Sequence, residues 1–320
     1  MMAGEAPLLD IQHLRIETAV GPIVEDVCLT VSRGEMVGLV GESGCGKTLT
    51  ALSILGLLPE QSVRIGGGRI LFKGDDLAGC DERRMTALRG SRIAMIFQEP
   101  MTSLNPVMTV GSQIAEVLAI HRGQRGRAAE ARVAELLAMV GLSAGAQMHR
   151  YPFQLSGGQR QRVMIAMALA CGPDLLIADE PTTALDVTVQ AQILELIARM
   201  QAELGMGCIL VTHDLGVVAE MCGRIAVMYA GRIVETGPAE ALFGAPMHRY
   251  TRALIDTIPA SNEPGRTLPA IPGMVPPPGA RARGCSFFDR CSAVTARCRD
   301  EAPPLVRRGD HVASCWNPAS

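Results

Sequence analysis

Apolar residues follow two different periods along the chain, and the change between them predicts how the structure is divided. From about residue 109 to residue 170 they recur at i, i+3, i+4 and i+7, as in amphipathic helices. Before and after this stretch, short apolar or alternating runs indicate strands, and a further helical pattern covers 187–203. The expected strands cover residues 8–17, 23–31, 36–40, 69–72, 92–97, 174–178 and 207–211.

Strands that alternate with helices are typical of a parallel sheet covered by helices, so we expect an α/β core interrupted by a helical insert. Composition changes again after residue 257. Seven prolines between 259 and 279 disfavour a helix or a central strand and indicate a stiff, extended linker. We therefore expect one domain over 1–258, with its helical subdomain at about 99–172, and a separate region over 259–320.

Residues 41–48, GESGCGKT, fit the phosphate-binding pattern G-x-x-x-x-G-K-[ST] between an apolar run and a helical run. The glycines let backbone N–H groups converge on phosphate oxygens, and the helix N-terminus adds positive potential. Lys47 can reach the β- and γ-phosphates, and the Thr48 hydroxyl can bind Mg²⁺. The alternative is an ordinary glycine turn before a helix. The residues expected to contact nucleotide here are Gly41, Glu42, Ser43, Gly44, Cys45, Gly46, Lys47, Thr48 and Thr50.

Two adjacent carboxylates, Asp179 and Glu180, follow the apolar run 174–178. Neighbouring carboxylates at a strand end are costly unless a cation lies there, and Mg²⁺ on a bound nucleotide supplies one. Asp179 is expected to hold the ion, and Glu180 to polarise the water that attacks the γ-phosphorus. The alternative is the polar loop start that is common after any parallel strand.

Ser156, Gly157 and Gly158 precede an expected helix at 160–170 and offer a second anion site at its N-terminus. One chain with two phosphate-binding ends but one nucleotide motif suggests that the two ends belong to different composite sites. The alternative is a serine cap followed by glycines.

Taken in order, these motifs resemble the nucleotide-binding subunit of an ABC transporter over residues 8–258. Residues 155–159 (LSGGQ) match the family signature, residues 175–180 the carboxylate strand, residues 184–186 the D-loop, and His213 the switch histidine. The resemblance implies a RecA-like parallel-sheet core, an N-terminal antiparallel β region and an inserted helical subdomain.

The resemblance also implies a mechanism in which two ATPase domains pair head to tail around two ATP molecules. Each ATP would meet the phosphate loop of one domain and the signature of the other. Gln98 would sense Mg²⁺ and the attacking water, His213 would hold the transition state, and Asp186 would couple the two sites. The expected signature contacts are Ser156, Gly157, Gly158 and Gln159. The expected catalytic residues are Lys47, Gln98, Glu180 and His213, and the expected Mg²⁺ ligands are Thr48, Gln98 and Asp179.

A narrower resemblance, to the D-type ATPase of bacterial dipeptide/oligopeptide importers, covers nearly the whole chain. It rests on residues 98–106, 160–169, 179–192 and 248–254 and on the proline–cysteine tail. It implies two membrane permease subunits, a sister ATPase that completes a heterodimer, and an extracytoplasmic peptide-binding protein. The chain would then lie peripherally on the cytoplasmic face of the inner membrane. Nickel and glutathione importers share the subfamily and are alternatives.

Four of the ten cysteines cluster late, in the spacing Cys285-x₅-Cys291-x₆-Cys298-x₁₆-Cys315, and six are scattered. In a reducing compartment we expect most of the scattered cysteines to be inert core residues, and the cluster to bind metal rather than form disulfides. Four thiolates suit a [4Fe–4S] cluster or Zn²⁺. The peptide-importer tails that this one resembles ligate [4Fe–4S], which favours that cluster over Zn²⁺ or unpaired thiols. So short a tail is expected to need a metal to fold.

Bulk properties disfavour other classes of function. The net charge is −2 and there is no basic tract, so we expect no nucleic-acid partner. This disfavours a soluble ABC-type ATPase acting on nucleic acid or ribosomes, which usually holds two cassettes in one chain. The N-terminus lacks the pattern of a signal peptide, and no apolar run approaches the roughly 18 residues that span a bilayer. A non-catalytic regulatory subunit is disfavoured because Lys47, Glu180 and His213 are all present.

Two departures from the family pattern carry expectations of their own. No aromatic residue precedes Phe72, so adenine stacking is weak or is supplied by an aliphatic residue such as Ile23, and ATP and GTP should be poorly discriminated. Cys45 stands where serine is usual, near Lys47 and a helix N-terminus, which both favour a thiolate. We therefore expect sensitivity to oxidants and alkylators that ATP protects against.

Overall fold

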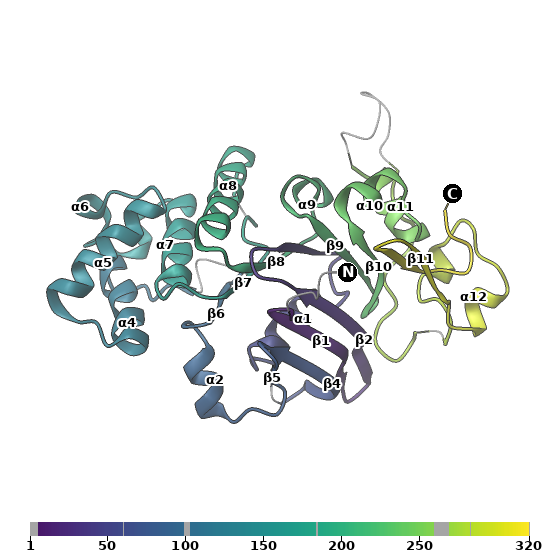
Figure 1. Cartoon of the computed structure of the whole chain (residues 1–320). Coiled ribbons are helices and arrows are strands. Elements are labelled where there is room, and N and C mark those ends of the chain that lie inside the picture. The colour runs from purple at the N-terminus through teal and green to yellow at the C-terminus, as the bar shows by residue number, and fades with distance from the viewer. Residues whose placement is uncertain are drawn as a thin grey trace. The chain divides into compact units, whose positions relative to one another are not determined.

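The computed structural model describes residues 6–59, 61–98, 103–183, 185–258, 269–281 and 283–319 (Figure 1). Residues 99–102 and 184, which belong to motifs discussed above, and residues 259–268 of the expected linker lie outside these ranges. The chain divides into a first compact unit, Met1–Gly79 with Leu210–Ser320, and a second, Cys80–Ile209. The cysteine tail thus belongs to the same compact unit as the N-terminal strands. The division into 1–258 and 259–320 stays a prediction.

The N-terminal strands of the first unit form a sheet in the order β2-β1-β4-β5 (Figure 1). β1 (Leu9–Thr18) and β2 (Gly21–Val31) are antiparallel and bury residues in near alternation, because successive side chains of a strand point to opposite faces. β4 (Arg64–Phe72) pairs with the other edge of β1, and β5 (Asp75–Asp76) pairs with β4. The expected N-terminal antiparallel region is confirmed.

A second sheet in the first unit carries the phosphate loop. β3 (Met36–Val40) is buried at every residue and runs parallel to β9 (Arg224–Tyr229), which is antiparallel to β10 (Arg232–Pro238). β8 (Gly207–Thr212) begins in the second unit and ends in the first. Helices of this unit are α1 (Lys47–Ile54), α9 (Leu215–Met221), α10 (Ala239–Gly244) and α11 (Arg249–Asp256).

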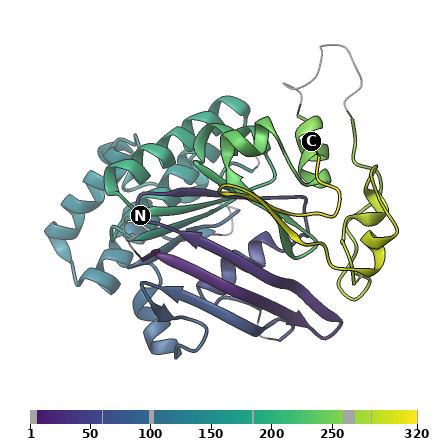
Figure 2. The ribbon, with the colours of Figure 1, turned by 45° about the vertical axis from the view of Figure 1, so that its right-hand side comes forward.

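The cysteine tail extends this second sheet, which its sequence pattern did not predict. β11 (Leu305–Arg308) and β12 (His311–Ser314) form a hairpin, and β12 pairs antiparallel with β10 (Figure 2). Upstream, Phe287 is buried against Tyr229 and Tyr250, with ring centroids 5.2 and 5.3 Å away. The tail therefore shares the core of the first unit. The expectation that it needs a metal to fold did not take this packing into account. Its short helices are η3 (Phe288–Arg290) and α12 (Arg297–Asp300).

The buried carboxylate of Glu235, on β10, ties this hairpin to the start of α11. It accepts hydrogen bonds from the backbone N–H groups of Met247 (2.6 Å) and His248 (2.9 Å), and His311 Nε2 lies 2.6 Å from Oε1. A buried carboxylate is costly unless donors surround it. These three partners therefore hold strand, helix and tail together.

The second unit contains the helical insert. β6 (Ile93–Ile96) runs parallel to β7 (Leu175–Asp179), and the helices between them bury the predicted apolar stripes. The helices of this unit are α2 (Glu82–Leu88), α4 (Val110–Arg122), α5 (Gly126–Met139), α6 (Ala144–Gln147), η1 (Pro152–Gln154), α7 (Gly157–Leu169) and α8 (Val187–Leu204). The α/β class is confirmed. Among the described residues, no helix combines the length and apolarity needed to cross a bilayer.

Candidate functional site

The phosphate loop joins the end of β3 to the start of α1, and its geometry requires glycine. Gly41, Gly44 and Gly46 have φ angles of 153°, 78° and 108°, a region that glycine adopts without strain. A Cβ atom on Gly41 would stand 2.1 Å from the carbonyl oxygen of Met228. The backbone can therefore curve tightly at the N-terminus of α1, the shape that phosphate binding needs.

The polar side chains at the start of α1 lie in different surroundings. Lys47 is buried, and its ammonium group donates to the carbonyl oxygens of Gly41 (2.8 Å) and Glu42 (3.0 Å), so Nζ lies over the loop. Thr48 is exposed at the helix N-terminus. Thr50 is buried, and its hydroxyl donates to a backbone carbonyl of the loop at 3.0 Å. Thr50 therefore supports the loop from inside.

The expectation of a reactive Cys45 is wrong. The side chain is fully buried, and burial raises the pKa of its thiol above the ordinary value. Lys47, whose Nζ is 3.8 Å from Sγ, favours the thiolate but does not outweigh this desolvation.

The cysteine tail holds Glu42 of the phosphate loop, a contact that sequence reasoning missed. Arg290 donates two hydrogen bonds to the Glu42 carboxylate, Nη1 to Oε2 at 2.7 Å and Nη2 to Oε1 at 2.9 Å. The Arg290 side chain is 5% exposed and its guanidinium lies 5.7 Å from the ring centroid of Tyr229. On the backbone, the Glu42 N–H donates to the hydroxyl of Tyr250 at 2.9 Å. The partners are 248 and 208 positions from Glu42, so no local pattern could have revealed them.

Within the second unit, the structure brings Gln98 and Glu180 together. The last paired residues of β6 and β7 lie two positions before them, so both side chains leave the same end of the strand pair. Gln98 Nε2 donates to Glu180 Oε2 at 2.9 Å, and the Thr183 hydroxyl donates to the same oxygen at 3.0 Å. Glu180 has a φ of 45°, which is uncommon for a residue other than glycine. Asp179, one position earlier, is 2% exposed.

The signature residues begin α7 as a capping box. The Ser156 hydroxyl accepts a hydrogen bond from the Gln159 N–H at 3.3 Å, and the Gln159 side chain accepts one from the Ser156 N–H at 3.1 Å. A Cβ atom on Gly158 would stand 2.7 Å from Val189 of α8, so this glycine permits close helix packing. Ser156 is exposed, and its binding of anions stays a prediction.

Asp186 and His213 also lie at element ends. The Asp186 carboxylate caps α8 by accepting from the Val189 N–H at 3.0 Å. His213 is exposed directly after β8. Their coupling and transition-state roles stay predictions.

The four tail cysteines converge on one cavity of about 10 Å³, which His248, Phe287 and Trp316 also line. Burial raises the pKa of the Cys285 thiol to about 11, with the other three thiols adding to the rise. Backbone N–H groups point at all four sulfurs. The donors are Phe287 to Cys285, Ala293 to Cys291, Thr295 to Cys298 and Asn317 to Cys315. Such donors are typical of metal–thiolate sites, so this residue set fits a metal centre.

Most of the scattered cysteines are buried, as expected. The buried ones are Cys45, Cys171, Cys208 and Cys222. Cys80 is partly exposed and Cys28 is exposed.

Known protein families match both the nucleotide-binding part of the chain and its C-terminal region. The family model described as "ABC transporter" matches residues 24–183, and the one described as "Oligopeptide/dipeptide transporter, C-terminal region" matches residues 234–298. A probable peptide ABC transporter ATP-binding protein of Sinorhizobium fredii is 51% identical, over 97% of this chain and 94% of its own length. A putative peptide import ATP-binding protein of Brucella ovis is 50% identical, over 96% of each chain.

Solved structures agree on the fold. A dimeric ATP-binding cassette in a post-hydrolysis state, bound to ADP and Pi, aligns with a TM-score of 0.64 and 29% identity over 72% of this chain and 98% of its own. The cbiO1 protein of Clostridium perfringens, part of the cbiONQ ABC transporter complex, aligns with a TM-score of 0.65 and 27% identity over 75% of this chain and 92% of its own. The chain therefore belongs to the ABC transporter family, as an ATP-binding, ATP-hydrolysing subunit of the oligopeptide/dipeptide importer type.

Proposed function

We propose that this chain drives the import of short peptides, with Glu180 as the base that activates water for ATP hydrolysis. The observation that carries the assignment is the pair of hydrogen bonds from Gln98 and Thr183 to one oxygen of Glu180, which orients the carboxylate at the end of β7. Glu180 takes a proton from water as the water oxygen attacks the γ-phosphorus. The bond from that phosphorus to the bridging oxygen breaks, and ADP and phosphate leave.

The other roles are proposed from the motif to which each residue belongs. Lys47 and the loop amides would bind the phosphates, and exposed Thr48 would be a ligand of Mg²⁺. Asp179 and Gln98 are the other proposed ligands of this ion. His213 stabilises the charge that develops on the γ-phosphate. Mg²⁺ supplies electrostatic stabilisation of the phosphates when it is bound.

Substitution of Glu180 tests this assignment. Glu180→Gln keeps the side chain's shape, so the variant should bind ATP and hydrolyse it at least about 100-fold more slowly, as expected for loss of a general base. The matched control is Glu203→Gln, at the far end of α8, which should hydrolyse ATP at the wild-type rate. Near-normal turnover by Glu180→Gln would refute the role of base.

We infer that the signature acts on the nucleotide of a partner ATPase, a sister chain in a heterodimer. Exposed Ser156 at the N-terminus of α7 supports this role, because it lies ready for an anion from outside its own unit. Ser156→Arg should stop hydrolysis of the ATP held by the partner, and so lower hydrolysis by the assembled pair, while this chain still binds ATP. Full hydrolysis by a pair carrying the variant would contradict the inference.

The proposed cargo is a di- or oligopeptide, delivered by an extracytoplasmic binding protein and moved by two permease subunits. The chain would lie on the cytoplasmic face of the inner membrane. The Sinorhizobium and Brucella relatives, named as probable and putative ATP-binding proteins of peptide transport, support peptide cargo. Nickel or glutathione is the alternative. Competition in reconstituted vesicles separates them: unlabelled dipeptides should block uptake of labelled dipeptide, and Ni²⁺ and glutathione should not.

We also propose that Cys285, Cys291, Cys298 and Cys315 hold a [4Fe–4S] cluster. The four thiols line one small cavity, and four thiolates are the ligands that such a cluster takes. Tetrahedral Zn²⁺ suits the same four ligands and is the alternative.

Metal and sulfide analysis of anaerobically purified protein tests the cluster. We expect about four irons per chain and a broad visible absorption that dithionite bleaches. Cys291→Ser should lose both, and Cys80→Ser, the matched control, should keep them. Colourless protein with stoichiometric zinc would overturn the proposal and make the tail a zinc site.

A further inference from the structure

Two bulges in the β1–β2 pair bring together three side chains that the ATPase reaction does not use. The register shifts so that His13 and its neighbour face Cys28 alone, and Asp26 and its neighbour then face one residue of β1. A bulge turns side chains away from the regular alternation of a strand. His13 and Asp26 have φ angles of 50° and 56°, and both side chains, with Cys28, point to solvent.

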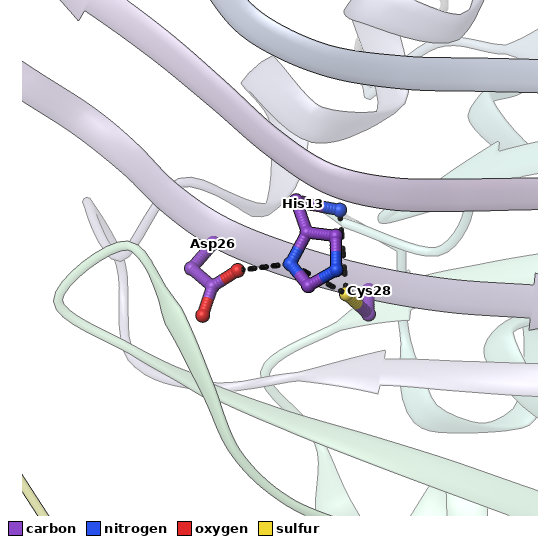
Figure 3. A group of neighbouring side chains, drawn as sticks. All are labelled: His13, Asp26 and Cys28. Atoms are coloured by element: carbon purple, nitrogen blue, oxygen red, sulfur yellow. Dashed lines mark hydrogen bonds and ion pairs between the residues drawn. The ribbon is translucent and has the colours of Figure 1, made fainter.

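The three side chains present a nitrogen, an oxygen and a sulfur to the same point (Figure 3). His13 Nδ1 lies 2.6 Å from Asp26 Oδ1 and 3.7 Å from Cys28 Sγ, and all three ligand atoms lie within 4.8 Å of one another. The side chains of His13 and Asp26 are 77% and 66% exposed, so an ion from solution can reach them.

Two of the arginines near this site are engaged by other carboxylates. Arg224, Arg232 and Arg307 line the adjoining cavity of about 490 Å³, and the first two are each paired with a glutamate. Arg224 lies 2.8 Å from Glu35, and Arg232 lies 2.9 Å from Glu25. Neither of these two arginines pairs with the Asp26 carboxylate, whose partner is His13.

We propose that His13, Asp26 and Cys28 bind one divalent transition-metal ion, with Zn²⁺ the best match. Imidazole, thiolate and carboxylate are the ligands of zinc sites, whereas Mg²⁺ and Ca²⁺ prefer oxygen alone. Three protein ligands leave the fourth tetrahedral position to water. On binding, the Cys28 thiol loses its proton to solvent, and the metal replaces the hydrogen bond between His13 and Asp26. The ion then links β1 to β2.

The alternative is a plain ion pair between His13 and Asp26 beside an unrelated cysteine. An exposed ion pair contributes little to the stability of the fold. The conformational cost of two non-glycine residues with positive φ is larger than that contribution. The ion pair also gives no role to Cys28, whose Sγ accepts from the His13 N–H at 3.3 Å. A metal gives all three side chains one role.

The test is a Co²⁺ titration of full-length protein whose tail site is already loaded, followed by absorption and metal analysis. Wild-type protein should bind one added ion per chain, with the near-ultraviolet absorption of a cobalt–thiolate bond. Cys28→Ser and His13→Ala should lose both signals. Cys80→Ser, which removes another partly exposed thiol, should keep them. Equal binding by wild type and Cys28→Ser would overturn the proposal.

Thermal unfolding with Zn²⁺ gives a second readout, because an ion that binds only the folded state raises Tm. Zn²⁺ should raise the Tm of wild type and of Cys80→Ser but leave that of Cys28→Ser unchanged. An equal rise in all three would also refute the site.

Discussion

Replacing Arg290 by Met should loosen the contact between the cysteine tail and the phosphate loop. The substitution removes the paired hydrogen bonds of 2.7 and 2.9 Å to Glu42 and leaves a carboxylate that is 30% exposed. Breaking a fully buried ion pair costs about 3–5 kcal/mol. Because water can partly replace Arg290 around Glu42, we expect a loss of about 2–3 kcal/mol. For a unit of this size, that lowers Tm by roughly 4–12 °C.

Thermal unfolding without nucleotide measures the effect, and a double-mutant cycle with Glu42→Gln isolates the pair. The two single substitutions should be strongly non-additive, because each removes the same interaction. Arg64→Met is the control, since Arg64 is 81% exposed and its ion pair with Glu17 should matter little. Hydrogen exchange should also show faster opening of the loop amides in Arg290→Met. A Tm within about 1 °C of wild type, or additive effects in the cycle, would refute the reasoning.

Three further predictions concern the first unit. Burial would raise the pKa of Glu35, but hydrogen bonds from Arg224 and Ser32 outweigh it and hold that pKa below the ordinary 4.5. The stabilisation is therefore present above pH 4.5 and lost as the pH falls through the lowered value, so Glu35→Gln should flatten the fall of Tm below pH 4.5. ATP and GTP should be hydrolysed with comparable kcat/KM, because no aromatic residue precedes Phe72; a strong ATP preference would contradict this. Buried Cys45 should not mediate inhibition by alkylators, so protection by Cys45→Ser would count against its burial.

Local chemistry explains what the sequence could predict. The phosphate loop is recognisable because its backbone must take positive φ at three positions, and glycine is the residue that does so without strain. The sequence predicted that the strands before Gln98 and Glu180 belong to one parallel sheet, but not that they are neighbours, so the contact between these two side chains came from the structure. The apolar stripes of the helices over 109–170 could also be predicted, because they depend only on the spacing of nearby residues.

Contacts between distant residues left no such pattern. β12 is four residues long and pairs with a strand about 75 positions away, so its alternation is too short to predict the docking of the tail. Nothing in the sequence around Arg290 indicated its hydrogen bonds to Glu42. The exposure of Cys28 could not be predicted, because it depends on bulges that alternation cannot locate. The predicted reactivity of Cys45 failed for a related reason. Its position in the motif favours a thiolate, but its burial, which depends on distant residues, opposes one.

Uptake of a labelled dipeptide into vesicles that carry the assembled transporter tests the central claim most directly. The account predicts uptake that requires ATP with the wild-type chain and is lost with Glu180→Gln, although that variant still binds ATP. Undiminished uptake with Glu180→Gln would contradict the claim that hydrolysis at this chain drives peptide import.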